Sequence, residues 1–124
     1  MNTATAVVLE APEQLVLSEL ELQHAGDADL VVDIDFSGIS TGTEKLLWSG
    51  RMPAFPGMGY PLVPGYESVG RVVAAGVHAR HRVGEHVFVP GARCFGPVRG
   101  LFGGAASRLV VDDERVYNVD PELG

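Results

Sequence analysis

The sequence predicts a mainly β domain, a small barrel of short strands with one or two short helices. Short apolar runs, several of which alternate with polar residues, indicate half-buried strands. The 16 glycines and 8 prolines are many for 124 residues, and they fall between these runs, where turns are expected. A chain of this length is sufficient for one domain with its own core.

The first three strands are predicted in the N-terminal third of the chain. Residues 3–9 form a β-branched, apolar run that stops before Pro12, and residues 14–22 alternate in part. Residues 30–36 alternate more cleanly, which places Val32, Ile34 and Phe36 on one face of a strand. A Gly-Asp pair at residues 26–27 predicts the turn before this third strand.

A short helix is predicted from about Thr43 to Trp48. Thr41 precedes Glu44 by the three residues of a capping box, and Gly50 is suited to end the helix. Thr41 and Glu44 therefore have a purely structural explanation, which is compatible with a functional one.

The rest of the chain is predicted to hold further strands and two long loops. The strands are expected at residues 67–75, 85–89, 107–111 and 116–119. Within the first of these, Gly70 marks a bulge or a close backbone approach, and Gly84 is expected to adopt a positive φ. The loops, residues 51–65 and 91–104, are rich in glycine, and long loops in a small domain are usually functional.

Charge and composition exclude several classes of protein. The net charge of −7 repels a phosphate backbone, so no nucleic-acid partner is expected. The single cysteine, Cys94, allows no intrachain disulfide and is expected to be a small packed residue. No signal peptide is recognised, and prolines interrupt the longest uncharged run, so we expect a cytoplasmic protein without a transmembrane segment. The oligomeric state stays open, with a homodimer among the options.

Four segments resemble the GroES-like catalytic domain of the medium-chain dehydrogenase/reductase superfamily. The most specific is Pro-Gly-Tyr-Glu-Ser-Val-Gly-Arg-Val at residues 64–72, which resembles the Pro-Gly-His-Glu-x-x-Gly-x-Val segment of that family. The others lie at residues 37–44, 82–87 and 103–111. The resemblance implies that residues 1–124 form one GroES-like catalytic, substrate-binding domain, truncated before an NAD-binding Rossmann domain.

The same resemblance implies that the catalytic zinc site of the family is lost. Tyr66 takes the position of a histidine ligand, while Glu67 keeps the acid of the family. The lost cysteine ligand aligns with Ser40, directly after Gly-Ile, or with Thr41 if one residue is inserted; the second alignment also matches the following Gly, Thr and acid. The four-cysteine zinc lobe is missing, and His78 and His81 are expected in an exposed loop. We therefore expect no zinc.

Two longer stretches, residues 55–70 and 89–96, resemble a narrower family, the dehydrogenases of 3-hydroxyethyl bacteriochlorophyllide a. This resemblance implies oxidation of the 3-(1-hydroxyethyl) group of a (bacterio)chlorophyllide to 3-acetyl, with NAD as the hydride acceptor. Without zinc, the hydroxyl proton would pass to Thr43 or Tyr66, and Glu67 and Glu44 are the candidate carboxylates. NADP in place of NAD stays open.

An apolar macrocycle needs an apolar wall, and five residues in and just before the first long loop are candidates: Trp48, Met52, Phe55, Met58 and Tyr60. The alternative is that they pack the core of the barrel. No Gly-x-Gly-x-x-Gly fingerprint is present, so NAD would be bound mainly by the protein's own C-terminal Rossmann domain, and these residues alone are expected to be inactive. The alternatives are another zinc-free medium-chain dehydrogenase/reductase, or a non-enzymatic barrel that binds a large apolar ligand.

Overall fold

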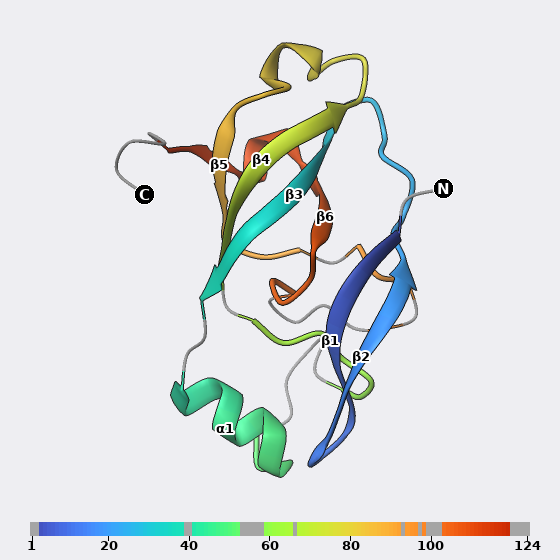
Figure 1. Ribbon diagram of the computed structural model, residues 1–124, viewed down its shortest axis with the longest axis vertical. Helices are drawn as coiled ribbons and strands as arrows, with labels where there is room; N and C mark the ends of the chain where they lie inside the picture. The colour runs from blue at the N-terminus through green and yellow to red at the C-terminus, as the bar shows by residue number, and fades with distance from the viewer. Residues whose placement is uncertain are drawn as a thin grey trace.

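The computed structural model describes residues 3–38, 41–52, 59–65, 67–92, 94–96, 98 and 103–119, with the backbone alone for residues 41–44. The mainly β prediction is confirmed: short strands dominate the described part, together with one α-helix and two 3-10 turns (Figure 1). The elements are β1 (Thr3–Ala11), β2 (Gln14–Glu21), β3 (Asp29–Gly38), α1 (Thr41–Ser49), β4 (Glu67–Ala75), η1 (Arg80–Arg82), β5 (His86–Val89), β6 (Arg108–Asp112), η2 (Asp113–Arg115) and β7 (Tyr117–Asn118).

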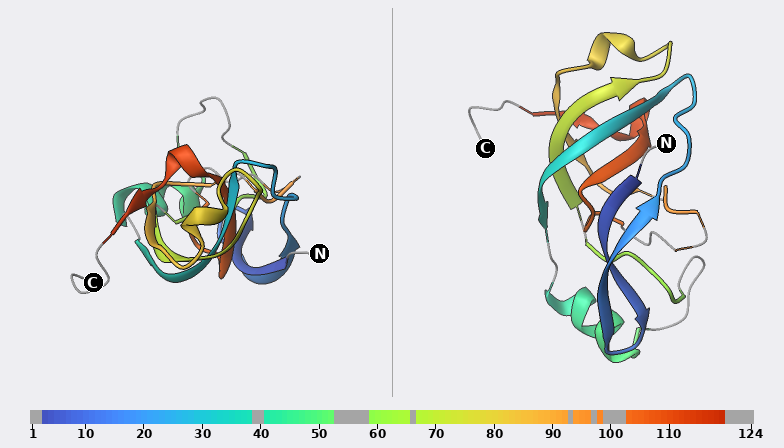
Figure 2. Two further views of the ribbon diagram at one scale, coloured as in Figure 1. Left: turned by 90° about the horizontal axis from the view of Figure 1, so that it is seen from above. Right: turned by 45° about the vertical axis from the view of Figure 1, so that its right-hand side comes forward.

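The strands form two sheets that stand side by side. The larger sheet has the order β6-β3-β4-β5-β7, and its neighbours all pair antiparallel. The smaller sheet is the β1–β2 ribbon, which isolated bridges from Ala6 to Ala106 and from Leu9 to Leu62 join to the rest of the molecule. The view from above in Figure 2 shows how the larger sheet curves. This arrangement is the small barrel that the sequence predicts.

The main core lies inside this curve and is filled by aliphatic side chains from both sheets. Alternate residues of β1, from Ala4 to Val8, face into it, and Leu30, Val72 and Leu109 are fully or almost fully buried there. Burying apolar area on this scale is the main force that favours the folded state. Among the residues described, no helix has the length and hydrophobicity needed to cross a membrane.

The alternation predicted for residues 30–36 fails at its end. Val32 is fully buried and Ile34 half-buried, but Phe36 is 72% exposed. The register of β3 against β4 shifts between Ile34 and Phe36, so Asp35 is an extra residue in β3. Such a bulge breaks the period-2 pattern, and it explains why Phe36 does not continue the buried face.

The predicted roles of three glycines are confirmed. Gly50 ends α1 with a φ of 76°, and Gly84 has a φ of 96° in the turn before β5. At Gly70, a Cβ atom would lie 2.1 Å from the carbonyl oxygen of Asp33, so β3 and β4 approach closely where only glycine fits. The helix begins at Thr41, two residues before the predicted start, and ends at Ser49.

Candidate active site

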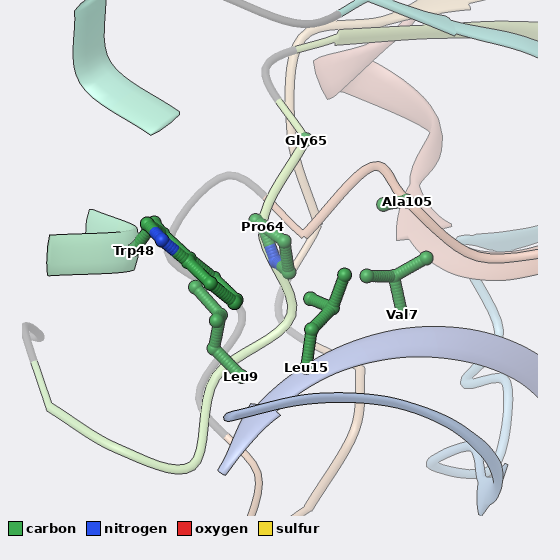
Figure 3. A pocket seen from close by; sticks show the side chains of 7 residues that line it. All are labelled: Val7, Leu9, Leu15, Trp48, Pro64, Gly65 and Ala105. Carbon is green, nitrogen blue, oxygen red and sulfur yellow. The ribbon is translucent and has the colours of Figure 1, made fainter. Parts of the chain in front are cut away.

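An apolar pocket of about 230 Å³ lies where α1, the β1–β2 ribbon and the segment before β4 meet. Figure 3 shows side chains of the ribbon rising toward Trp48, which comes from the end of α1, and toward Pro64. The described lining residues are all uncharged: Val7, Leu9, Leu15, Trp48, Pro64, Gly65 and Ala105. A lining of this kind favours an apolar ligand surface over a charged one.

Near its tip, the β1–β2 ribbon is apolar on both faces, and only one face packs against the main core. On the other face, Val7 lies opposite Leu17, and Leu9 lies opposite Leu15. Leu15 is 53% exposed and Leu17 is 75% exposed, so an apolar surface extends from the pocket along β2. Large contiguous patches of exposed apolar side chains are rare on soluble proteins, and where they occur they often mark a binding site.

Of the five residues predicted as the apolar wall, Trp48 lines the pocket and is 40% exposed. Phe55 and Met58 lie outside the described residues. Trp48 is held in place by the backbone: its carbonyl oxygen accepts a hydrogen bond from the amide of Glu13, in the turn of the ribbon, at 2.7 Å. This bond joins the tip of the ribbon to the end of α1.

Met52 and Tyr60 pack beside the pocket, in a second and smaller apolar cluster. Both are half-buried against its buried members, Leu9, Leu47 and Leu62. The Tyr60 hydroxyl donates a hydrogen bond to the carbonyl oxygen of Leu47 at 2.5 Å. These two side chains therefore support the floor under Leu9, which itself lines the pocket.

Glu67, the predicted acid, is the first residue of β4 and is half-buried. It lies opposite Gly38, the last residue of β3. A Cβ atom on Gly38 would lie 3.0 Å from Cγ and 3.3 Å from Oε1 of Glu67, so the Glu67 side chain lies across the space that Gly38 leaves open. Two residues before Glu67 in the chain, Gly65 lines the pocket.

The other predicted members of the proton relay lie outside what the structure describes. Tyr66 is not among the described residues. Thr43 and Glu44 belong to the first half of α1, where only the backbone is described. Their roles stay predictions. So does the choice between Ser40 and Thr41 for the lost cysteine, because Ser40 also lies outside the described residues.

Two serine hydroxyls that the sequence did not single out meet at the carbonyl oxygen of Gly104. Ser37 Oγ donates to this oxygen at 2.5 Å, and Ser68 Oγ donates at 2.9 Å. The two serines lie opposite each other in the β3–β4 pairing, so their side chains share one face of the sheet. Ser68 is 1% exposed, and it is the only polar residue that is buried among the described residues.

The segment that carries Gly104 also holds the chain just before β4. The amide of Gly104 donates to the Gly65 carbonyl oxygen at 3.3 Å, and the amide of Ala105 donates to Pro64 at 3.0 Å. Residues on both sides of position 66 are thus tied to one short segment. Nothing in the local sequence signals this contact, because the partners lie 36 or more residues apart.

The described residues include no group of three or more His, Cys, Asp or Glu side chains that could hold a metal ion. Cys94 is fully buried, and its Sγ accepts a hydrogen bond from the Val110 amide at 3.4 Å. Burial raises the pKa of the Cys94 thiol, which makes it a poor nucleophile. The predicted packing role of Cys94 is confirmed, as is the exposure of His78 and His81.

Comparison with known families agrees with this fold. A family model described as "Alcohol dehydrogenase GroES-like domain" matches residues 26–121. The chain belongs to this alcohol dehydrogenase GroES-like domain family. The resemblance predicted from residues 37–44, 64–72, 82–87 and 103–111 is therefore confirmed.

Two curated relatives of this GroES-like domain share one name, 2-desacetyl-2-hydroxyethyl bacteriochlorophyllide A dehydrogenase. The protein from Rhodobacter capsulatus is 57% identical over 119 residues, which are 95% of this chain and 38% of that protein. The protein from Cereibacter sphaeroides is 53% identical over 124 residues, which cover 96% of this chain and 39% of that protein. The chain thus spans about two fifths of the length of these relatives.

A solved structure shows the same fold at lower identity. The crystal structure of CAD from Helicobacter pylori, which is complexed with NADP(H), superposes with a TM-score of 0.76 at 19% identity. The match covers 95% of this chain and 42% of that one. The GroES-like barrel is therefore shared with a protein whose sequence has diverged widely.

The donor groups of this GroES-like domain do not fit the zinc that part of the family binds. By the resemblance described above, Tyr66 and either Ser40 or Thr41 take two positions that bind zinc in the zinc-dependent members. Neutral hydroxyls are poor zinc ligands compared with thiolate and imidazole. We derive no catalytic step through zinc, and the absence of a zinc site stays a prediction.

Proposed function

We propose that this chain is the substrate-binding part of an NAD-dependent alcohol dehydrogenase, which oxidises the 3-(1-hydroxyethyl) group of a (bacterio)chlorophyllide to 3-acetyl without zinc. The observation that carries the proposal is the identity of 57% and 53%, over almost the whole chain, to two dehydrogenases of that name. This identity is far higher than a shared barrel requires, because the Helicobacter pylori protein has the same fold at 19% identity.

The oxidation removes a hydride from the carbinol carbon and a proton from the hydroxyl oxygen. NAD would accept the hydride, and it would be held by other parts of the full-length protein, because the strands described here pair antiparallel and offer no βαβ unit. The residues of this chain would accept the hydroxyl proton. Thr43 or Tyr66 would take it from the substrate, with Glu67 or Glu44 as the carboxylate that finally accepts it.

The apolar pocket would hold an edge of the macrocycle. Its volume of about 230 Å³ lies below the range of about 300–1,000 Å³ that encloses a drug-sized ligand, so a whole tetrapyrrole does not fit inside. The rest of the ring would lie on the exposed apolar face of the ribbon, which continues through Leu15 and Leu17. Gly65 lines the pocket two residues before Glu67, and this supports a position of the substrate's 3-(1-hydroxyethyl) group near the proposed relay.

A chimeric enzyme tests this proposal. Residues 1–124 replace the aligned segment of the Rhodobacter capsulatus enzyme, and the chimera is incubated with NAD and a 3-(1-hydroxyethyl) bacteriochlorophyllide. We expect one NADH for each product, and a product that has lost two hydrogen atoms by mass spectrometry. The unaltered Rhodobacter capsulatus enzyme serves as the control.

Two outcomes would contradict the proposal. A folded chimera that binds the tetrapyrrole but forms no NADH would indicate a binding module, for which the exposed apolar face of the ribbon is the supporting observation. A chimera that oxidises other alcohols and leaves the tetrapyrrole unchanged would indicate a different zinc-free dehydrogenase.

A further inference from the structure

We propose that Ser68 is a positioning residue, whose buried hydroxyl fixes the Gly104 carbonyl and thereby holds the Glu67 carboxylate at its place over Gly38. The inference rests on the proposed function, in which Glu67 serves the proton relay. Ser68 and Gly104 touch no reacting atom in this scheme, and they act through the backbone of Glu67.

Glu67 has Gly104 near its backbone carbonyl group and Gly38 near its side chain. A Cβ atom on Gly104 would lie 3.4 Å from the carbonyl oxygen of Glu67, 3.5 Å from its carbonyl carbon and 2.6 Å from Ser68 Oγ. On the other side, the Glu67 side chain crosses the open space over Gly38. The Gly104 segment thus packs against the backbone of Glu67, through which it would set the direction of the side chain.

The Ser68 hydroxyl sets this packing. Neighbouring residues of a strand point to opposite faces, so Ser68 turns toward Gly104 while Glu67 turns toward Gly38. The Ala106 amide also donates to the Gly104 carbonyl oxygen, at 3.0 Å, but it belongs to the Gly104 segment itself. The Ser68 hydroxyl is therefore the buried donor that joins the segment to β4, and its hydrogen bond opposes any retreat of the segment. Ser37 donates to the same oxygen, but its side chain is exposed and water can replace it.

The same segment holds the chain on the other side of position 66. The amides of this segment donate hydrogen bonds to the carbonyl oxygens of Pro64 and Gly65. Its Gly104 carbonyl oxygen accepts the hydrogen bond from Ser68. The backbone on both sides of the proposed relay is thus fixed to one segment. A small displacement of a catalytic group can reduce turnover by up to about a hundredfold without a comparable loss of binding.

The test is Ser68→Ala in the chimeric enzyme described above, with Ser107→Ala as the matched control. Ser107 lies in the same part of the chain, is exposed, and its hydroxyl oxygen accepts a hydrogen bond from the Thr5 amide on the side of the ribbon. We expect Ser68→Ala to lower kcat by about tenfold with KM for NAD and for the tetrapyrrole within about twofold, because geometry is lost and binding is kept. Ser107→Ala should keep the kcat of the parent chimera.

Equal kcat values for Ser68→Ala and the parent would overturn the inference, whatever the change in thermal stability, and so would an equal loss in Ser107→Ala. If Ser68→Ala does not fold, Ser68→Cys decides, because it keeps the buried volume with a weak donor; the expected loss in kcat is similar, and a parental kcat overturns the inference. An inactive parent chimera contradicts the proposed function, and with it this assignment, whereas an active parent with a fully active Ser68→Ala variant contradicts the assignment alone.

Discussion

Gly65 and Gly84 share almost the same backbone conformation, with φ of 98° and 96°, but their surroundings differ. A Cβ atom on Gly65 would lie 2.5 Å from the amide nitrogen of Ala105, whereas a Cβ atom on Gly84 would meet nothing within 4 Å. The first glycine is needed for its conformation and for the close approach of the Gly104 segment. The second is needed for its conformation alone.

Alanine at each position separates the two requirements. We expect Gly84→Ala to lower the free energy of unfolding by about 1–2 kcal/mol, the cost of a left-handed backbone for an L-residue. Gly65→Ala should cost about 1–3 kcal/mol more, because the added methyl group overpacks against Ala105. Urea denaturation of the 124-residue chain measures both. Equal losses would contradict the close contact at Gly65.

The proton relay is also a matter of single residues. Thr43→Val removes a hydroxyl from α1, and Tyr66→Phe removes one at the position of the lost histidine ligand. In the chimeric enzyme, each should lower kcat far more than substrate affinity, by roughly 10²–10⁴-fold, because a group that moves a proton is lost. Steady-state kinetics on folded variants measures this. If both variants keep kcat within about threefold of the parent, well below that range, the relay assignment is wrong.

At this scale the sequence predicted some parts of the site and missed others. Glu67 could be selected because its segment resembles a family motif, and Trp48 because a large aromatic side chain precedes a long loop. Met52 and Tyr60 were grouped with Trp48 on the same grounds, yet they pack in the small cluster. Ser68 carried no signal, since its partner Gly104 lies 36 residues away.

At the scale of elements, local periodicity predicted the strands well. β4 has the predicted bounds, and the other predicted strands overlap the observed ones. The pattern failed at Asp35, because a bulge depends on the neighbouring strand and not on the strand itself. The turns η1 and η2 were not predicted, since three residues are too few to show a period.

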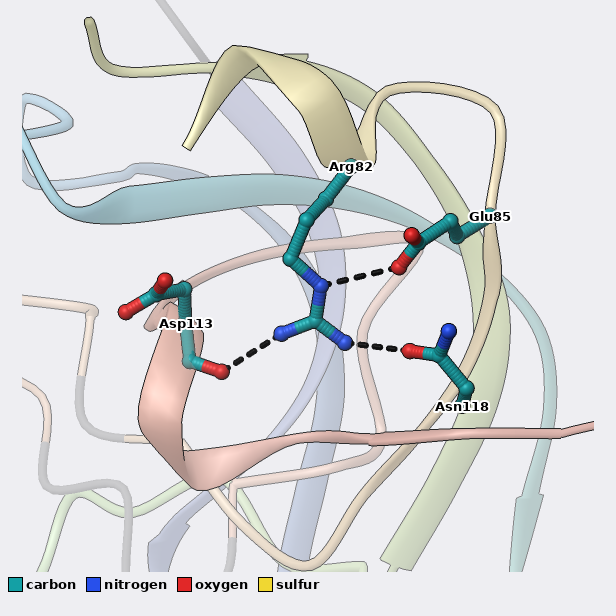
Figure 4. A network of polar contacts seen from close by, with 4 residues as sticks. All are labelled: Arg82, Glu85, Asp113 and Asn118. Carbon is teal, nitrogen blue, oxygen red and sulfur yellow. Dashed lines mark hydrogen bonds and ion pairs between the residues drawn. The ribbon is translucent and has the colours of Figure 1, made fainter. Parts of the chain in front are cut away.

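One side chain joins three of these elements (Figure 4), at the end of the sheet remote from α1 in Figure 1. Arg82, from η1, donates from Nε to Oε1 of Glu85 at 2.8 Å and from a terminal nitrogen to the carbonyl oxygen of Asp113, in η2, at 2.6 Å. Its other terminal nitrogen donates to the side-chain oxygen of Asn118, in β7. The Arg82 side chain is 13% exposed, so water cannot easily take over these bonds.

We expect Arg82→Ala to lower the free energy of unfolding by about 2–3 kcal/mol, because hydrogen bonds to a charged, largely buried group are lost together. Arg80→Ala is the matched control, since Arg80 is exposed in the same turn and should change stability by less than about 0.5 kcal/mol. Thermal or urea unfolding measures the difference. Similar losses in both variants would show that the network does not stabilise this end of the sheet.

At the scale of the whole molecule, the sequence predicted the barrel but not how its two sheets meet. The contact between β1 and the segment before β6 joins residues about 100 positions apart, as in the bond from the Thr5 amide to Ser107 Oγ. Pairing at such separations leaves no periodic trace in the sequence. The exposure of Leu15 and Leu17 was likewise not predicted, because the partial alternation of residues 14–22 was interpreted only as a half-buried strand.

The described part of the 124-residue chain lacks the features that bind NAD in dehydrogenases. Dinucleotides bind at a parallel βαβ unit with a glycine-rich turn, and the strand pairings described here are antiparallel. The sequence also contains no Gly-x-Gly-x-x-Gly segment that opens a helix. We therefore expect calorimetry to detect no NAD binding by this chain and no oxidation of the tetrapyrrole, whereas the chimera should bind NAD. Micromolar NAD binding by the isolated chain would show that the GroES-like domain itself carries a cofactor site.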